Sequence, residues 1–244
     1  MNLIDLLDLA KLSAEVAGKF LIENRITLNE EISNIGRDIK LEADTKTESL
    51  IRDILSKSDI PILGEEGEHN TKDFGSKYWV VDPLDGTANF SRGIPICCVS
   101  IALIDNDKPI LGVINDFNHN ELYFGSIETP SMKNNELLRI SDIKNTDKGT
   151  LMTGLPVNTD YSDIGMKKLI ERFQKWKKVR MIGSAAMASI YVASGKAEMY
   201  FESGTNIWDV AAGIAIAEAA GGKVIISNQK ADHSLDIEIS NGKF

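Results

Sequence analysis

The stretch from Trp79 to Phe90, WVVDPLDGTANF, sets two carboxylates three residues apart, directly after an apolar run that predicts a buried strand. Pro83 fixes its own φ and biases Asp82 toward an extended conformation, while a glycine after Asp85 allows a sharp bend. Both acidic side chains can therefore converge on one point, as a divalent-metal site requires. The alternative to a metal site is an ordinary Asx-Pro turn in which the second Asp is solvated. Each half of the stretch, taken alone, favours this turn.

Two other acidic turns accompany this stretch. Glu65 and Glu66 follow a short apolar segment that predicts a strand, and Asp209 opens an Ala-rich helical stretch far downstream. Mg²⁺ prefers carboxylate and carbonyl oxygens and leaves its remaining positions to water and substrate phosphate. N–H groups of Gly86 and Thr87, where a helix can begin, suit that phosphate. Asp209 could instead be a simple helix N-cap. The complete ordered set favours a metal site over four coincident surface acids.

These motifs resemble those of the inositol monophosphatase family, part of a superfamily of Mg²⁺-dependent, lithium-sensitive phosphomonoesterases. The family pattern of Gly-Glu-Glu, then Asp-Pro-Ile/Leu-Asp-Gly-Thr-x-Asn-Phe, then Trp-Asp-x-x-Ala/Gly-Gly occurs here in order, within a match from about Asp38 to Gly222. The resemblance implies an α+β fold, the layered α-β-α-β-α sandwich of the inositol monophosphatase and fructose-1,6-bisphosphatase type. We expect one unit, 1–244, with most metal ligands in subregion 1–138 and with Asp209 and the substrate contacts in 139–244.

The same resemblance implies roles for individual residues. Two to three Mg²⁺ ions per site would be held by Glu65, Asp82, the backbone carbonyl of Leu84, Asp85 and Asp209. The catalytic residues would be Glu65, near the attacking water, and Thr87, oriented by Asp44. Substrate contacts would come from Gly86, Thr87, Gly183, Ser184, Ala185 and Glu202.

Simpler interpretations stay open for some of these residues. Asp44 and Glu48, four apart on an expected helix, could form a solvated face that pairs with Lys40 or Lys46, and the pair alone favours that reading. Glu202 could equally be a helix-dipole or salt-bridge partner near the downstream acidic turn. The histidines have no ligand spacing, so they receive no role and zinc is poorly supported: His69, His119 and His233.

The predicted reaction is hydrolysis of a small phosphate monoester by metal-activated water, which would make the protein a phosphoric monoester hydrolase. Inositol monophosphate or a related polyol phosphate is the favoured substrate, because a carboxylate such as Glu202 can accept hydrogen bonds from hydroxyls. The alternatives are a 3′(2′),5′-bisphosphate nucleotidase acting on adenosine 3′,5′-bisphosphate, a histidinol-phosphate phosphatase, and a catalytically silent metal-binding homologue. Asn89 and Phe90 are typical of the inositol branch, whereas Leu84 and Gly67 are familiar from the nucleotidase branch.

Composition and charge fit a globular enzyme. The chain has 244 residues, 43% hydrophobic and 26% charged, and its formal net charge of -9 argues against a nucleic-acid partner. It has no basic secretory start and no apolar run long enough to span a bilayer, so we expect a cytoplasmic protein without a membrane partner. The adjacent Cys97 and Cys98 should point to opposite faces of a strand as buried, reduced thiols. The resemblance also implies a homodimer.

Hydrophobic spacing predicts the order of the elements. Helices are expected over residues 3–24 and 43–56, strands dominate residues 78–124, and helices and strands alternate beyond residue 139. The later helices are expected near 165–176, 184–193 and 210–219. The family hairpin expected after Phe124 is replaced by residues 126–135, which bears on dimer contacts and substrate selectivity.

Overall fold

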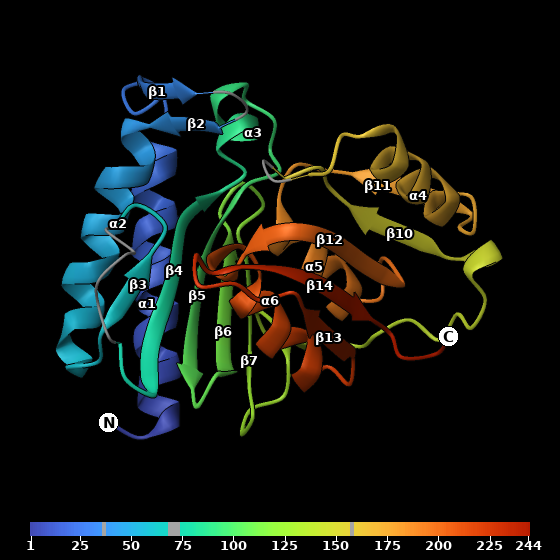
Figure 1. Cartoon of the computed structure of the whole chain (residues 1–244). Helices are drawn as coiled ribbons and strands as arrows, with labels where there is room; N and C mark the ends of the chain where they lie inside the picture. The colour runs from blue at the N-terminus through green and yellow to red at the C-terminus, as the bar shows by residue number, and fades with distance from the viewer. Residues whose placement is uncertain (36–37, 68–73, 157–158) are drawn as a thin grey trace.

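The computed structural model describes residues 1–35, 38–67, 74–156 and 159–244. His69, which receives no role from the sequence, lies outside these segments. Two large sheets dominate the fold, and helices cover their outer faces and fill the space between them (Figure 1). The layers therefore follow the order α-β-α-β-α, which confirms the predicted sandwich.

The first outer layer contains two helices and a hairpin. α1 (Leu3–Glu23) and α2 (Glu42–Leu55) lie against the first sheet, and a 3₁₀ turn, η1 (Ser56–Ser58), follows α2. The antiparallel hairpin of β1 (Glu31–Ile35) and β2 (Asp38–Leu41) connects the helices. The apolar residues of α1 recur on one buried face, as the predicted periodicity requires. In the described part of the chain, no helix is long and apolar enough to cross a membrane.

The first sheet has seven strands in the order β3-β4-β5-β6-β7-β8-β9. They are β3 (Ile62–Gly64), β4 (Lys77–Asp85), β5 (Cys98–Asp105), β6 (Lys108–Asp116), β7 (Glu121–Ser126), β8 (Met132–Lys133) and β9 (Glu136–Leu137). β3 runs parallel to β4, and each later neighbouring pair is antiparallel. A short helix, α3 (Thr87–Ser91), follows β4 at the edge of the site.

The second sheet has five strands in the order β11-β10-β12-β14-β13. They are β10 (Thr150–Thr153), β11 (Lys178–Met181), β12 (Met199–Asn206), β13 (Lys223–Ser227) and β14 (Ser234–Ser240), with a 3₁₀ turn, η2 (Thr146–Lys148), before β10. α5 (Ala185–Ala193) and α6 (Ile207–Ala219) form the middle layer, and α4 (Asp163–Phe173) lies on the outer side (Figure 1).

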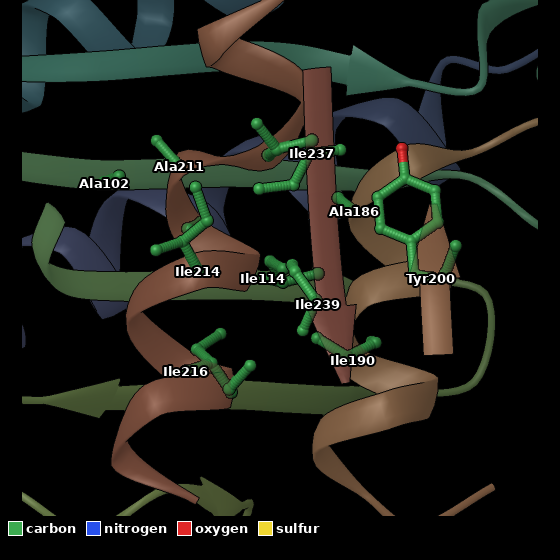
Figure 2. Close-up of a cluster of buried hydrophobic side chains, with 14 of the residues drawn as sticks. Ala102, Ile114, Ala186, Ile190, Tyr200, Ala211, Ile214, Ile216, Ile237 and Ile239 are labelled. Atoms are coloured by element: carbon green, nitrogen blue, oxygen red, sulfur yellow. The ribbon is translucent and has the colours of Figure 1, made fainter. Parts of the chain in front are cut away.

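The core has two parts, one on each face of the seven-stranded sheet. One part packs α1 and α2 against the sheet, and the other packs α5 and α6 between the two sheets, as Figure 2 shows for the apolar side chains of α5, α6 and β14. Cys97 belongs to the first part and Cys98 to the second, and both are free and buried. The predicted arrangement of the two thiols on opposite faces is confirmed.

Close backbone contacts fix the position of α6. A Cβ at Gly112 of β6 would overlap the backbone of Ala212, and a Cβ at Gly213 would overlap the side chain of Ser189 in α5. Because these glycines have no side chain, α6 can lie against both its sheet and its neighbouring helix. The start of α6, which contains Asp209, is thereby held close to β4, the strand that contains Asp82 and Asp85.

Candidate active site

A pocket of about 270 Å³ opens where residues from both sheets meet, and most of the predicted site residues line it. These lining residues are Glu65, Asp85, Gly86, Thr87, Gly183, Ser184, Ala185, Glu202 and Asp209. Three further predicted residues, Asp44, Asp82 and Leu84, are buried next to this lining. The structure thus brings together all of the residues that the sequence analysis selected, from segments that span residues 44 to 209.

The end of β4 turns in the way the sequence predicts. The pairing of β4 with β5 shifts register between Asp82 and Asp85, which places both carboxylates at an irregular strand end. Gly86 then adopts φ 92°, and a Cβ there would approach the carbonyl oxygen of Ile96 to 2.8 Å. Only glycine tolerates both conditions, so this residue makes the turn into α3 possible.

Thr87 and Asp44 form a hydrogen-bonded pair beside this turn. The Thr87 hydroxyl lies 3.1 Å from Asp44 Oδ1 and 3.0 Å from the Leu84 carbonyl oxygen, and donates to these acceptors. Asp44 Oδ2 accepts from the N–H of Leu41 at 2.6 Å. Burial raises the pKa of Asp44 to about 6, even though these hydrogen bonds favour the charged form.

The solvated face suggested for Asp44 and Glu48 is wrong. Both side chains are buried, and Glu48 binds Arg52 at 2.8 Å and accepts from the N–H of Glu66 at 2.8 Å. Lys46 pairs with Glu42 instead. Because α2 packs against the sheet, its acidic face points at the turn after β3 rather than at solvent.

Five carboxylates lie close enough at the centre of the site to raise one another's pKa values. Burial, followed by the charges of Asp209 and Asp44, raises the pKa of Glu65 well above its usual value. Burial, Glu65 and Asp85 do the same for Asp82. Such mutual repulsion would be relieved by a cation, which is the electrostatic condition of a metal site.

Asp85 is held by the start of α5, which belongs to the second half of the chain. Its Oδ2 accepts from the Ser184 hydroxyl at 2.5 Å and from the N–H of Ala186 at 2.7 Å, and its Oδ1 accepts from the N–H of Ala185 at 3.3 Å. Burial raises the pKa of Asp85 to about 6 despite these donors. Cys98 Sγ lies 3.9 Å from Asp85 Oδ2, a neighbour that the sequence analysis did not identify. Ser184 and Ala185 therefore anchor a carboxylate as well as lining the pocket.

Asp209 is not the N-cap of α6, so that alternative is wrong. Asn206 occupies the cap position, and Asp209 is the third helical residue, where its carboxylate closes a capping box. Its Oδ2 accepts from the Thr205 hydroxyl at 2.8 Å and from the N–H of Asn206 at 2.9 Å. Thr205, at the end of β12 just before the cap of α6, is another site residue that the sequence did not reveal.

Glu202 also lines the pocket, from β12 of the second sheet. Among the described residues it forms no ion pair, so the salt-bridge alternative for this side chain is wrong. Tyr200, two residues earlier on the same face of β12, donates its hydroxyl to Glu202 Oε2 at 2.8 Å. Burial and the charges of Asp209 and Asp85 raise the pKa of Glu202 to about 8, although the Tyr200 hydrogen bond opposes the rise.

The potential metal ligands have the chemistry that Mg²⁺ prefers, but they do not form a complete coordination site. In segments 1–35, 38–67, 74–156 and 159–244, no three Asp, Glu, His or Cys side chains are arranged as they stand to hold a metal ion. Protein donors occupy Asp82, Asp85 and Asp209, and the N–H of Leu84 donates to Asp82 Oδ1 at 3.0 Å. The potential ligands are all carboxylate or carbonyl oxygens, which is the set that hard divalent cations prefer. The metal-ligand roles of these residues remain predictions.

Comparison with known proteins identifies the relatives of this chain. The model of the inositol monophosphatase family matches residues 5–242. The chain belongs to the inositol monophosphatase family. Membership makes it a phosphatase, a phosphoric monoester hydrolase, and magnesium dependence and lithium sensitivity are typical of this family.

Similar sequences and structures agree with this assignment. An inositol-1-monophosphatase from Synechocystis is 34% identical over 206 residues, which cover 80% of this chain and 70% of the relative. A fructose-1,6-bisphosphatase/inositol-1-monophosphatase from Thermotoga maritima is 33% identical over 84% of this chain and 79% of the relative. The structure of an inositol monophosphatase from Anabaena superposes with a TM-score of 0.84 and 31% identity, over 100% of this chain and 93% of that one.

Proposed function

We propose that this member of the family hydrolyses a monophosphate ester of inositol or of a related polyol, with Mg²⁺ as the metal. The observation that carries the proposal is the composition of the pocket, which holds a cluster of mutually repelling carboxylates together with a further carboxylate, Glu202, from the second sheet. The cluster suits a metal and a phosphate, and Glu202 suits the hydroxyls of the alcohol.

The residues proposed to hold the metal line the pocket or lie buried beside it: Glu65, Asp82, Asp85, Asp209 and the carbonyl of Leu84. When bound there, two to three Mg²⁺ ions would neutralise the phosphate oxygens and lower the pKa of the attacking water. The N–H groups of Gly86 and Thr87, at the start of α3, would bind the phosphate. Asp85 keeps its orientation through α5, and Asp209 through Thr205.

Thr87 would accept a hydrogen bond from the attacking water and so orient it. Its only hydroxyl proton is directed at Asp44 and the Leu84 carbonyl, so the remaining lone pairs of Oγ1 can accept a hydrogen bond from water. Asp44 would hold this orientation throughout the reaction. Glu65, on the neighbouring turn, would orient the same water molecule.

The pocket lining also supports a monophosphate over a bisphosphate. Among the described residues that line it, none is Lys, Arg or His. A second phosphate needs such cations for tight binding, which disfavours adenosine 3′,5′-bisphosphate. Histidinol phosphate is the second candidate, because Glu202 could accept from its ammonium group as it would from a hydroxyl.

Parallel phosphate-release assays at fixed Mg²⁺ test the proposal. The substrates are inositol 1-phosphate, histidinol phosphate, adenosine 3′,5′-bisphosphate and fructose 1,6-bisphosphate. We expect the highest kcat/KM for inositol 1-phosphate. A preference for histidinol phosphate would move the second candidate to first place, and a preference for either bisphosphate would contradict the assignment of the pocket.

Two further parts of the proposal concern the protein as a whole. We expect a homodimer, which sedimentation at working concentration would detect and a monomeric profile would contradict. We also expect a cytoplasmic location without a nucleic-acid partner, which cell fractionation and a nucleic-acid binding assay at physiological salt would test.

A further inference from the structure

Tyr200 lies at the junction between the apolar core and the pocket. Its ring is fully buried beside Ala186 of α5, at the edge of the apolar cluster in Figure 2. Its hydroxyl reaches Glu202 Oε2 at 2.8 Å. Because side chains two residues apart share one face of a strand, the rigid ring of Tyr200 determines where this oxygen of Glu202 lies.

Gly154 leaves the space that the other carboxylate oxygen of Glu202 occupies. This glycine directly follows β10, which pairs in parallel with β12, and it lines the pocket together with Glu202. A Cβ at residue 154 would overlap Oε1 of Glu202. The φ of Gly154 does not require glycine, so space for the carboxylate explains this residue better than backbone conformation does.

We infer that Tyr200 and Gly154 are positioning residues that hold the Glu202 carboxylate in one orientation and thereby make the pocket selective for hydroxyl-bearing phosphate esters. This inference rests on the proposed function and deepens it. Neither residue needs to touch the phosphate or the reacting atoms. Their loss should therefore weaken recognition of the alcohol and leave phosphate hydrolysis intact.

The test compares two substrates in the full-length protein with Mg²⁺. Inositol 1-phosphate presents hydroxyls to Glu202, whereas p-nitrophenyl phosphate has none on its leaving group. In Tyr200→Phe, we expect KM for inositol 1-phosphate to rise about fivefold to tenfold, because one hydrogen bond to the carboxylate is lost. kcat for this substrate, and kcat/KM for p-nitrophenyl phosphate, should stay within twofold of wild type.

Gly154→Ala tests the second contact. The overlapping atom is the far end of a flexible side chain, so the added methyl group should displace the Glu202 carboxylate and leave the fold intact. The expected selectivity change is the same as for Tyr200→Phe. A circular dichroism spectrum and melting curve close to wild type would confirm that each variant folds.

Tyr123→Phe is the matched control. Tyr123 donates to Glu121 Oε2 at 2.5 Å, also two residues away on a strand, but neither residue lines the pocket. This variant loses the same kind of tyrosine-to-carboxylate hydrogen bond and should change neither KM. A double-mutant cycle supplies a second control, because Tyr200→Phe should have no further effect on KM in a Glu202→Ala background.

The outcomes separate the inference from the function on which it rests. Equal losses on both substrates in Tyr200→Phe, no loss on either, or additive effects with Glu202→Ala would overturn the inference alone. If wild type shows no Mg²⁺-dependent turnover of either ester, the proposed function fails, and the inference fails with it. A selective rise in KM for inositol 1-phosphate that disappears in the Glu202→Ala background supports both.

Discussion

Two tyrosine–glutamate pairs in this molecule have the same local geometry and different surroundings. Tyr123 and Glu121 lie two residues apart on β7, and Tyr200 and Glu202 lie two residues apart on β12, with the hydroxyl donating to the carboxylate in each pair. In the first pair, Lys133 Nζ approaches Glu121 at 3.0 Å. In the second pair, the charged neighbours are the carboxylates of the pocket.

The surroundings reverse the direction of the pKa shift. Burial would raise the pKa of Glu121, but hydrogen bonds from Tyr123 and Lys133 outweigh it and lower the pKa. Burial and neighbouring carboxylates raise the pKa of Glu202 to about 8. Glu121 is already neutralised by a lysine and stabilises the end of its strand. Glu202 lies among like charges and is therefore suited to bind a ligand.

The largest effect should come from changing a charge in the pocket itself. Asp209→Asn should lower kcat/KM for inositol 1-phosphate by at least about 10³-fold, because a metal-held carboxylate supports several kcal/mol of transition-state stabilisation. The fold should survive, since Asn retains an oxygen that can accept from Thr205 and Asn206. Phosphate release at saturating Mg²⁺ measures the effect.

Glu121→Gln, in the tyrosine–glutamate pair outside the pocket, provides the control. It removes a charged hydrogen-bond acceptor outside the pocket, so its kcat/KM should stay within twofold of wild type. Wild-type turnover in Asp209→Asn, or equal losses in the two variants, would contradict the assignment of the acidic cluster.

A smaller effect should follow from loosening the anchor of Asp85. Ser184→Ala removes both the donor to Asp85 and the N-cap of α5, whereas Ser162→Ala removes only the N-cap of α4. Each variant should lose about 1 kcal/mol of unfolding free energy, measured in urea. Only Ser184→Ala should raise the Mg²⁺ concentration for half-maximal activity, by about tenfold. The same Mg²⁺ requirement in both variants would show that Asp85 needs no anchor.

Thermal stability should report the repulsion between the carboxylates. Mg²⁺ at about 100 times its dissociation constant should stabilise wild type by about 2.7 kcal/mol. Asp82→Asn removes one of the repelling charges, so it should melt at a higher temperature than wild type in EDTA and gain less from Mg²⁺. Differential scanning calorimetry measures both shifts, with Glu121→Gln as the control that keeps the full Mg²⁺ response. A lower melting temperature for Asp82→Asn in EDTA would argue against net repulsion.

The last prediction concerns the pH dependence of stability without divalent cations. The pKa values of Asp44 and Asp85 rise from 3.8 to about 6, and that of Glu202 rises from 4.5 to about 8. Between about pH 4 and 8 the folded state therefore binds more protons than the unfolded state, so the unfolding free energy should fall as pH rises through this window. Urea titrations at several pH values measure the slope. Glu202→Gln should flatten the upper part of the curve, and an unchanged slope in that variant would contradict the raised pKa.

Local features of the site could be predicted from the sequence. Pro83 and Gly86 act within the turn that contains them, and the adjacent cysteines had to point to opposite faces of their strand. The family motifs were sufficient to predict the layered fold and to select Glu65 and Asp209, which the structure brings to one pocket. Each of these inferences depends on a short segment of chain or on an ordered motif.

Features that depend on contacts distant in sequence could not be predicted. Asp44 could not be recognised as buried until α2 was placed against the sheet. The hydrogen bond from Ser184 to Asp85 joins residues 99 positions apart, and no local sequence pattern predicts it. The position of Tyr200 beside Glu202 could have been predicted, because side chains two residues apart on a strand share one face. That its hydroxyl donates to the Glu202 carboxylate is evident only from the packed structure.

The most direct test of the central claim is the dependence of phosphate release from inositol 1-phosphate on Mg²⁺. The wild-type protein would be stripped with EDTA, assayed, and then titrated with Mg²⁺ in parallel with Asp209→Asn. We expect no release in EDTA, restoration by Mg²⁺ in wild type, and almost none in the variant. Equal release with and without Mg²⁺, or equal restoration in both proteins, would contradict a metal-dependent phosphatase site in this pocket.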